Sequence, residues 1–268
     1  MTGRAADGAP GKPARDPRAF NDVAALYDEV RPSYSTETID AIVSLAGLSP
    51  GARILEIGCG TGQITLPLAA RGYAITALEP GDALATLAAR KCRPYPKVEI
   101  VQTSFESWAP PPQKFDLVLA AQAFHWIEPR WGCARAAMVL RPAGSIALVW
   151  YLDVSQSTAF WQATLPIYDA WFGAGAATGP TLAAQVDRYE AALRESGAWD
   201  EVRRTRQTWE HVYAGADYLK LLSTFSDHRA LPEPKRTAFF QAISDTIARF
   251  GGQVRRLYET HILSARQQ

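Results

Sequence analysis

Short runs of apolar residues alternate with helix-like segments between residues 50 and 152, and this alternation is the clearest pattern in the chain. Five of the runs have the length of a strand, at residues 53–57, 73–78, 98–101, 115–120 and 145–151. Helical spacing occurs in the segment that ends near Arg71 and at residues 83–90 and 130–140. Short apolar runs joined by helical crossovers are typical of a parallel sheet that is buried on both faces. We therefore predict an α/β fold with a doubly wound, mostly parallel sheet.

The segments on either side of this core are predicted to be mainly helical. Apolar spacing predicts one helix at residues 20–30 and a second that Ser35 or Thr36 can cap. Beyond Tyr151 we predict helices at residues 157–173, 181–196, 215–225 and 235–250, and strands at residues 202–212 and near 254–262. The chain then divides into a tail (1–18), N-terminal helices (19–49), the α/β core (50–152) and a helical cap with the final strands (153–268).

The charge and the hydropathy pattern exclude several classes of protein. The 268 residues include 28 lysines and arginines against 27 aspartates and glutamates, a net charge of +1, so no strong field attracts nucleic-acid phosphates. No run of 18 apolar residues is present to span a membrane. Residues 1–18 lack the apolar segment of a secretion signal, and their glycines and prolines predict disorder. We expect a cytoplasmic protein without a nucleic-acid or membrane partner.

Cysteine and histidine give no sign of a metal site or a disulfide framework. The three cysteines, Cys59, Cys92 and Cys133, form no CxxC pair. Apart from His125, the histidines are scattered along the second half of the chain. We therefore expect no metal cofactor.

A glycine-rich loop follows the first predicted strand, in the stretch LEIGCGTGQIT at residues 55–65. Gly58 and Gly60 allow a tight turn in which backbone N–H groups approach a ligand closely. A dinucleotide fingerprint requires glycine at position 63, where Gln63 stands, and a phosphate-binding P-loop requires a lysine that is absent. Glu56 would repel a pyrophosphate but favour a cationic or zwitterionic ligand. The alternative is a tight turn that binds nothing.

Glu79 ends the second predicted strand, 17 residues after Gly62. An acidic side chain at this place in a doubly wound sheet typically accepts hydrogen bonds from ribose hydroxyls. On its own, Glu79 could equally be a solvated residue at a helix entry. Together with the glycine loop it favours a nucleoside-containing ligand.

Residues 50–150 resemble the class I methyltransferases that use S-adenosylmethionine. The stretches LEIGCGTGQIT, ALEPG and AQAFHW are similar to the small-molecule branch of that family, which includes trans-aconitate-methyltransferase-like (methyltransferase type 11) proteins. The resemblance extends in part to Tyr27 and Arg31 in the preceding segment. It implies a Rossmann-like sheet, S-adenosyl-L-methionine as cofactor, and a small-molecule substrate.

The resemblance also implies a set of cofactor-binding residues. Glu56, Gly58 and Gly60 would surround the methionine portion and the sugar, and Glu79 would hold both ribose hydroxyls. The full expected set is Tyr27, Arg31, Glu56, Gly58, Cys59, Gly60, Gln63, Glu79, Pro80, Ser104, Phe105 and Gln122.

One of these assignments departs from the family pattern, and two lie outside the predicted α/β core. Ser104 stands where the family often has an acidic residue that meets the adenine amine, so the residue that contacts the adenine edge is open, and the backbone N–H of Phe105 is our choice. Tyr27 and Arg31 would close the cofactor site from the N-terminal helices. Arg31 would then meet the carboxylate of the cofactor.

His125 follows the fourth predicted strand, where methyl transfer is expected, and is our candidate catalytic residue. An imidazole suits a hydroxyl acceptor as general base, whereas a carboxylate acceptor needs no base. His125 could also contact the substrate without taking a proton, or could pack at the edge of the sheet. The tetrapeptide with which DNA-base methyltransferases hold a flipped base is absent at this position.

Aromatic residues are abundant, at 10% of the chain, and one group lies at Phe160, Trp161, Tyr168, Trp171 and Phe172. This group is either cap core or, together with the neighbours of His125, an enclosure for the acceptor. Arg203, Arg204 and Arg206 form either a solvated face or an anion site.

These features predict an S-adenosylmethionine-dependent methyltransferase that acts on a small organic acceptor at a hydroxyl or carboxylate oxygen. The alternatives are a protein that binds the same cofactor for another reaction or for regulation, and, less favoured because of Gln63, an NAD-dependent oxidoreductase.

Overall fold

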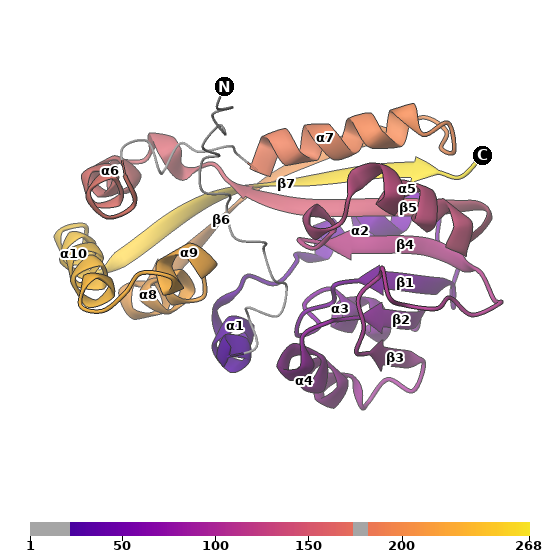
Figure 1. Ribbon diagram of the computed structural model, residues 1–268, viewed down its shortest axis with the longest axis horizontal. Helices are drawn as coiled ribbons and strands as arrows, with labels where there is room; N and C mark the ends of the chain where they lie inside the picture. Colours follow the sequence, from indigo (N-terminus) through magenta and orange to yellow (C-terminus); the bar gives the residue numbers. More distant parts are fainter. Residues whose placement is uncertain (1–21, 174–181) are drawn as a thin grey trace, which may run out of the picture.

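The computed structural model describes residues 22–173 and 182–268 of the chain (Figure 1). Three predicted features lie outside these residues: the tail, the start of the helix predicted at 20–30, and the first residue of the helix predicted at 181–196. Among the described residues, no helix is long and apolar enough to cross a membrane.

The core of the fold is a seven-stranded sheet in the order β3-β2-β1-β4-β5-β7-β6 (Figure 1). Its strands are β1 (Arg53–Ile57), β2 (Ala74–Leu78), β3 (Val98–Val101), β4 (Phe115–Ala121), β5 (Leu140–Asp153), β6 (Arg203–Ala214) and β7 (Gln253–Arg266). The first five are parallel, whereas β7 runs antiparallel to both β5 and β6. The predicted doubly wound, mostly parallel sheet is therefore confirmed.

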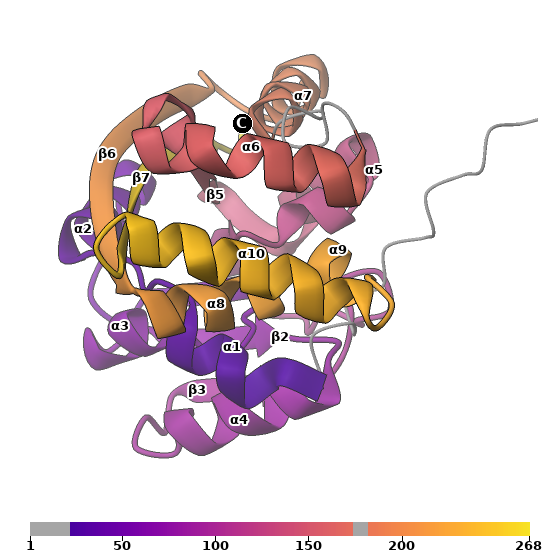
Figure 2. The same cartoon turned by 90° about the vertical axis from the view of Figure 1, so that its left-hand side faces the viewer.

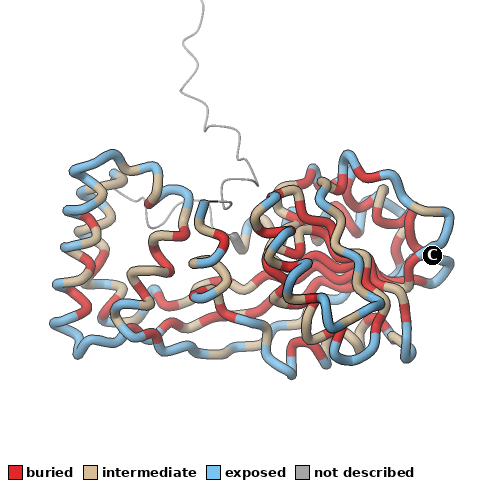
Figure 3. Tube along the Cα trace, turned by 90° about the horizontal axis from the view of Figure 1, so that it is seen from below, coloured by how far each residue is buried: buried red, intermediate tan, exposed pale blue. Residues whose placement is uncertain are grey.

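Helices cover both faces of this sheet, which explains why its central strands are mostly apolar. On one face lie α2 (Thr36–Ala46), α3 (Thr65–Ala70) and α4 (Asp82–Cys92), packed on residues such as Ile54 and Leu117. On the other lie α5 (Pro129–Val139) and α7 (Leu182–Glu195), packed on residues such as Leu55 and Val118. Figure 3 shows the buried residues gathered along these strands.

The predicted boundaries agree with the structure for two short strands and for the start of α2. β1 and β3 have the predicted bounds, and Ser35 caps α2 by accepting a hydrogen bond from the Thr38 N–H at 3.2 Å. β5 begins five residues earlier than predicted and ends two residues later. The early part contains Pro142 and Gly144, which are turn signals, but Leu140 nevertheless pairs with Phe115.

The strands β5, β6 and β7 extend beyond the core of the sheet as a long arm that reaches a second group of helices (Figure 1). We call this group the cap: α6 (Ala159–Phe172), α8 (Gly215–Ser223), α9 (Ser226–Arg229) and α10 (Lys235–Arg249). Its own apolar core includes Phe160, Tyr218 and Phe239 and is completed by Val30 of α1 (Ala24–Val30). Figure 2 shows α10, α8 and α1 stacked beneath α6. The short α9 lies just beyond the predicted end of the helix at 215–225.

Candidate active site

The glycine loop bends sharply over the carboxyl ends of β1 and β2. Gly58, Gly60 and Gly62 have φ values of +69°, +57° and +91°, which favour glycine. The N–H groups of Gly58 and Cys59 donate to the carbonyl oxygen of Leu78 at 2.8 and 3.0 Å. A Cβ atom on Gly58 would lie only 2.4 Å from the Cβ of Ala123, so the backbone approach at this point requires glycine.

Glu79 links this loop to the end of β2. One carboxylate oxygen accepts the Gly60 N–H at 2.9 Å and the other accepts the Gly81 N–H at 2.8 Å. Burial raises the pKa of this carboxyl group, and the two N–H donors oppose the shift. Each oxygen keeps a further lone pair with which it can accept another hydrogen bond.

Glu56 projects from β1 into the buried centre of the site. Only 1% of this residue is exposed, and its Oε2 atom has no hydrogen-bond partner among the described residues. Burial raises its pKa to about 8, and the charge of Glu79 acts in the same direction. Because burying a polar atom without a partner costs free energy, this position favours a ligand that brings a donor or a positive charge.

All twelve predicted cofactor-binding residues line one cavity of about 350 Å³ at this edge of the sheet. Its volume lies within the range of about 300–1,000 Å³ typical of small-molecule sites. Leu84 and Tyr151 also line the cavity, but the sequence pattern did not select them. Trp126, one of the predicted aromatic neighbours of His125, lines it as well. Ser104, Phe105 and Glu106 border it together, and the assignment of the adenine edge among them stays a prediction.

Arg31 connects the cofactor cavity to the cap. Its guanidinium lies between the rings of Tyr27 and Phe225, with its central carbon 4.9 and 4.7 Å from the ring centroids. Its Nε atom is buried and has no hydrogen-bond partner among the described residues. Burial also raises the pKa of Tyr27 to about 12, so this hydroxyl remains protonated at neutral pH.

A second cavity of about 260 Å³ adjoins the first and contains the candidate catalytic residue His125. The two cavities share six lining residues: Tyr27, Arg31, Pro32, Gln122, Trp126 and Tyr151. Gln122 has a φ of +54°, which is uncommon for a residue with a side chain, and its Nε2 donates to the Tyr151 carbonyl at 2.9 Å. The strained residue at the end of β4 therefore lies where the two cavities meet.

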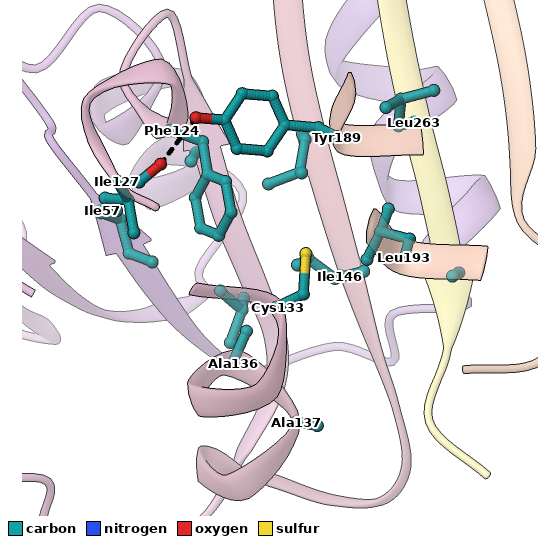
Figure 4. Close-up of a cluster of buried hydrophobic side chains, with 14 of the residues drawn as sticks. Ile57, Phe124, Ile127, Cys133, Ala136, Ala137, Ile146, Tyr189, Leu193 and Leu263 are labelled. Carbon is teal, nitrogen blue, oxygen red and sulfur yellow. Dashed lines mark hydrogen bonds between the residues drawn. The ribbon is translucent and has the colours of Figure 1, made fainter. Parts of the chain in front are cut away.

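The 3₁₀ turn η2 (Phe124–Trp126) holds His125 at the mouth of the second cavity. Phe124 is fully buried and packs edge-on against Tyr189 of α7, with ring centroids 5.5 Å apart. The Tyr189 hydroxyl donates to the Ile127 carbonyl at 2.7 Å, as the dashed line in Figure 4 shows. The backbone is thus fixed on both sides of His125 by buried contacts.

The structure decides between the alternatives that the sequence left open for two groups of residues. None of the aromatic residues between Phe160 and Phe172 lines either cavity. Phe160, Tyr168, Trp171 and Phe172 pack in the apolar core of the cap, and Trp161 packs against Tyr168 and Arg256. Arg203 and Arg204 are paired with acidic neighbours away from the cavities, as Arg203 contacts Glu201 and Arg204 contacts Asp187.

Sequence reasoning also missed the cap side of the second cavity. That side is formed by Asp153 of β5, Arg256 and Tyr258 of β7, and the cap residues Leu221 and Phe225. The alternation of Arg256 and Tyr258 on a strand, with both side chains on one face, is the signal that could have identified part of it.

Comparisons with known proteins agree with this arrangement. Residues 54–144 match the family model of a methyltransferase domain. The chain is 30% identical to the 27-O-demethylrifamycin SV methyltransferase of Amycolatopsis mediterranei over 200 residues, which cover 71% of this chain and 70% of the relative. It is 34% identical to an uncharacterized methyltransferase of Mycobacterium tuberculosis over 133 residues, which span about half of each protein (49% and 51%).

A solved structure shows the same fold. It is a S-adenosylmethionine-dependent methyltransferase from Thiobacillus denitrificans in complex with S-adenosylhomocysteine. The TM-score is 0.55 at 16% identity, with 91% of this chain and 98% of the other covered. The sheet order, the glycine loop and the cavity beside it define a methyltransferase domain of class I. The chain belongs to the S-adenosylmethionine-dependent methyltransferases, and S-adenosylmethionine is the cofactor of that family.

Proposed function

We propose that this protein transfers a methyl group from S-adenosylmethionine to an oxygen atom of a small organic acceptor. The observation that carries the proposal is the junction of the two cavities, where one contains every predicted cofactor-binding residue and the other contains His125. A cofactor in the first cavity and an acceptor in the second would meet beside Gln122. The net charge of +1 supports a small acceptor rather than a nucleic acid.

The residues of the first cavity suit the chemical groups of this cofactor. The unpartnered Oε2 of Glu56 favours the ammonium group, and the unpartnered Nε of Arg31 favours the carboxylate. Glu79 has lone pairs for the two ribose hydroxyls, and its position is fixed by the Gly60 and Gly81 N–H groups. When bound, S-adenosylmethionine supplies a methyl group that is attached to a positively charged sulfur. After transfer, the rest of the cofactor leaves as a neutral thioether.

The residues of the second cavity orient the acceptor and handle its proton. The reaction mainly requires that the acceptor oxygen be held in line with the methyl carbon, which the rigid β4 end and η2 favour. As the oxygen forms its bond to carbon, a hydroxyl acceptor gives its proton to the imidazole of His125. A carboxylate acceptor carries no such proton, and His125 would then only contact it.

Cofactor binding is tested by calorimetry with S-adenosylhomocysteine and, separately, with NAD. We expect the protein to bind S-adenosylhomocysteine and not NAD. Binding of NAD without binding of S-adenosylhomocysteine would refute the proposal. Formation of S-adenosylhomocysteine from S-adenosylmethionine is then followed with a panel of hydroxyl and carboxyl acceptors. A protein that binds the cofactor but never consumes it would be a binding module or would catalyse another reaction.

The role of His125 is tested by His125→Ala, with His211→Ala as the control because His211 is exposed and lines neither cavity. If His125 is the base, turnover falls by about 100-fold or more while affinity for S-adenosylhomocysteine is unchanged. Turnover equal to that of the control would assign His125 to packing.

A further inference from the structure

Three charged side chains line the second cavity: Arg31, Arg256 and Asp153. The cavity therefore contains two guanidinium groups and a single carboxylate. Arg31 also lines the first cavity and is assigned above to the cofactor, which leaves Arg256 and Asp153 for the acceptor side.

Arg256 is held rigidly at the cap end of the cavity. Its side chain is 7% exposed, and its guanidinium carbon lies 5.4 Å from the Trp161 ring centroid and 5.3 Å from that of Tyr218. One terminal nitrogen donates to the Tyr218 hydroxyl, and the other is ion-paired with Asp153. Contacts on several sides fix the orientation of the guanidinium, as a preformed binding group requires.

One nitrogen of the Arg256 guanidinium remains without a partner in the described part of the chain. Its Nε atom is buried and has no hydrogen-bond partner among the described residues. A buried donor without an acceptor is costly, and a guanidinium matches the planar geometry of a carboxylate. Asp153 is more exposed than Arg256, at 19% of its side chain, so an incoming anion could share or replace its contact.

We propose that the acceptor is a small acid whose carboxylate binds Arg256, while its body lies among the aromatic residues of the second cavity. This inference rests on the proposed function, because it names the class of acceptor for the same site. The rings of Trp126, Tyr151 and Phe225 line the cavity between the two arginines and favour a flat apolar body. A volume of about 260 Å³ limits that body to a small molecule.

The competing role for Arg256 is purely structural. Its contacts join β7 to α6 through Trp161, to α8 through Tyr218 and to β5 through Asp153, so the pair could simply fasten the cap to the arm. Asp153→Asn separates the two roles because the Asn side chain can still accept the Ser155 N–H, now 2.9 Å from Asp153 Oδ1. If Arg256 binds the acceptor, loss of the Asp153 charge frees its guanidinium and raises the affinity for an anion. If the pair is only structural, the substitution does not raise that affinity.

The test uses the full chain saturated with S-adenosylhomocysteine and titrated calorimetrically with benzoate, phenylacetate and 3-phenylpropionate, each compared with its own amide. We expect at least one acid to bind about tenfold more tightly than its amide, since a charged hydrogen bond is lost in the amide. Asp153→Asn should tighten binding of that acid and leave the amide unchanged. If no acid is preferred over its amide, or if Asp153→Asn weakens acid binding, the proposal is wrong.

Arginine variants provide the second arm. Arg256→Met should abolish the preference for the acid and Arg256→Lys should keep part of it, while the exposed Arg206→Met serves as a control for general attraction of anions. A preference that survives in folded Arg256→Met, checked by circular dichroism, refutes the assignment. If Arg256→Met does not fold, Arg256→Lys and Asp153→Asn decide. None of these titrations requires methyl transfer. If acid binding depends on Arg256 but no acceptor in the panel is methylated when S-adenosylmethionine is supplied, the proposed function is refuted and the Arg256 assignment stays in place.

Discussion

The close approach of Gly58 to Ala123 gives a quantitative prediction for the variant Gly58→Ala. The new Cβ would lie 2.4 Å from the Cβ of Ala123, whereas ordinary contacts begin near 3.4 Å, so the loop must move by about 1 Å. Overpacking of this kind costs about 1–3 kcal/mol. The positive φ of +69° adds about 1–2 kcal/mol for any residue with a side chain.

Gly72→Ala is the matched control because it has the cost of the positive φ without the cost of overpacking. Gly72 has a φ of +84°, and an added Cβ meets nothing within 4 Å. We expect Gly72→Ala to lose about 1–2 kcal/mol of unfolding free energy and to bind S-adenosylhomocysteine normally. Gly58→Ala should lose about 2–5 kcal/mol in total. If loop displacement carries the overpacking cost, its affinity for S-adenosylhomocysteine falls about 5- to 150-fold.

Urea denaturation and calorimetry measure the two quantities separately. The reasoning is refuted if Gly58→Ala binds S-adenosylhomocysteine as tightly as Gly72→Ala does. It is also refuted if the two variants lose the same unfolding free energy, because the contact with Ala123 would then contribute nothing.

Two further predictions concern Glu56 and Phe225. Because the pKa of Glu56 is about 8 in the folded protein and 4.5 as its ordinary value, its favourable contribution is complete below pH 4.5 and is lost as the pH rises to about 8. Urea denaturation at pH 5 and pH 8 should therefore show Glu56→Gln gaining stability relative to the unsubstituted protein as pH rises, by roughly 3–4 kcal/mol between these two pH values. An equal difference at both pH values would contradict the shift. Phe225→Ala removes a ring from Arg31 and should weaken S-adenosylhomocysteine binding about 2- to 30-fold by calorimetry, although Phe225 does not line the cofactor cavity. Phe250→Ala, in the same region but outside both cavities, should bind normally, and equal affinities of the two variants would show that Phe225 does not support Arg31.

The cofactor side of the site was predictable because its residues lie on local patterns. β1 and β3 were placed to the residue, because each is a short, mostly apolar run close to glycine or proline residues. The glycine spacing and Glu79 are both tied to strand ends, and the carboxyl ends of neighbouring parallel strands meet at one edge. The residues chosen on those grounds line a single cavity.

The acceptor side depends on contacts between distant segments, which local periodicity does not reveal. Asp153 and Arg256 are about a hundred positions apart and meet only because β5 pairs with β7 in the antiparallel direction. Phe225 reaches Arg31 from a short loop between two cap helices. The aromatic group around Tyr168 could not be assigned to core or pocket from the sequence, because its helical spacing is the same whether the stripe faces a ligand or the neighbouring helix α10.

The pairing of β5 with β7 also determines how the acceptor site can change during evolution. Asp153 is opposite Tyr258 in the register, and Tyr151 and Arg256 lie two positions away on the same face. A single-residue insertion in β7 between Tyr258 and the sheet core would turn Arg256 and Tyr258 to the opposite face at once. Point substitutions at these positions, by contrast, leave the backbone pairing intact. New acceptor preferences are therefore expected to arise by exchange of side chains along the arm, while insertions accumulate in the loops between the cap helices.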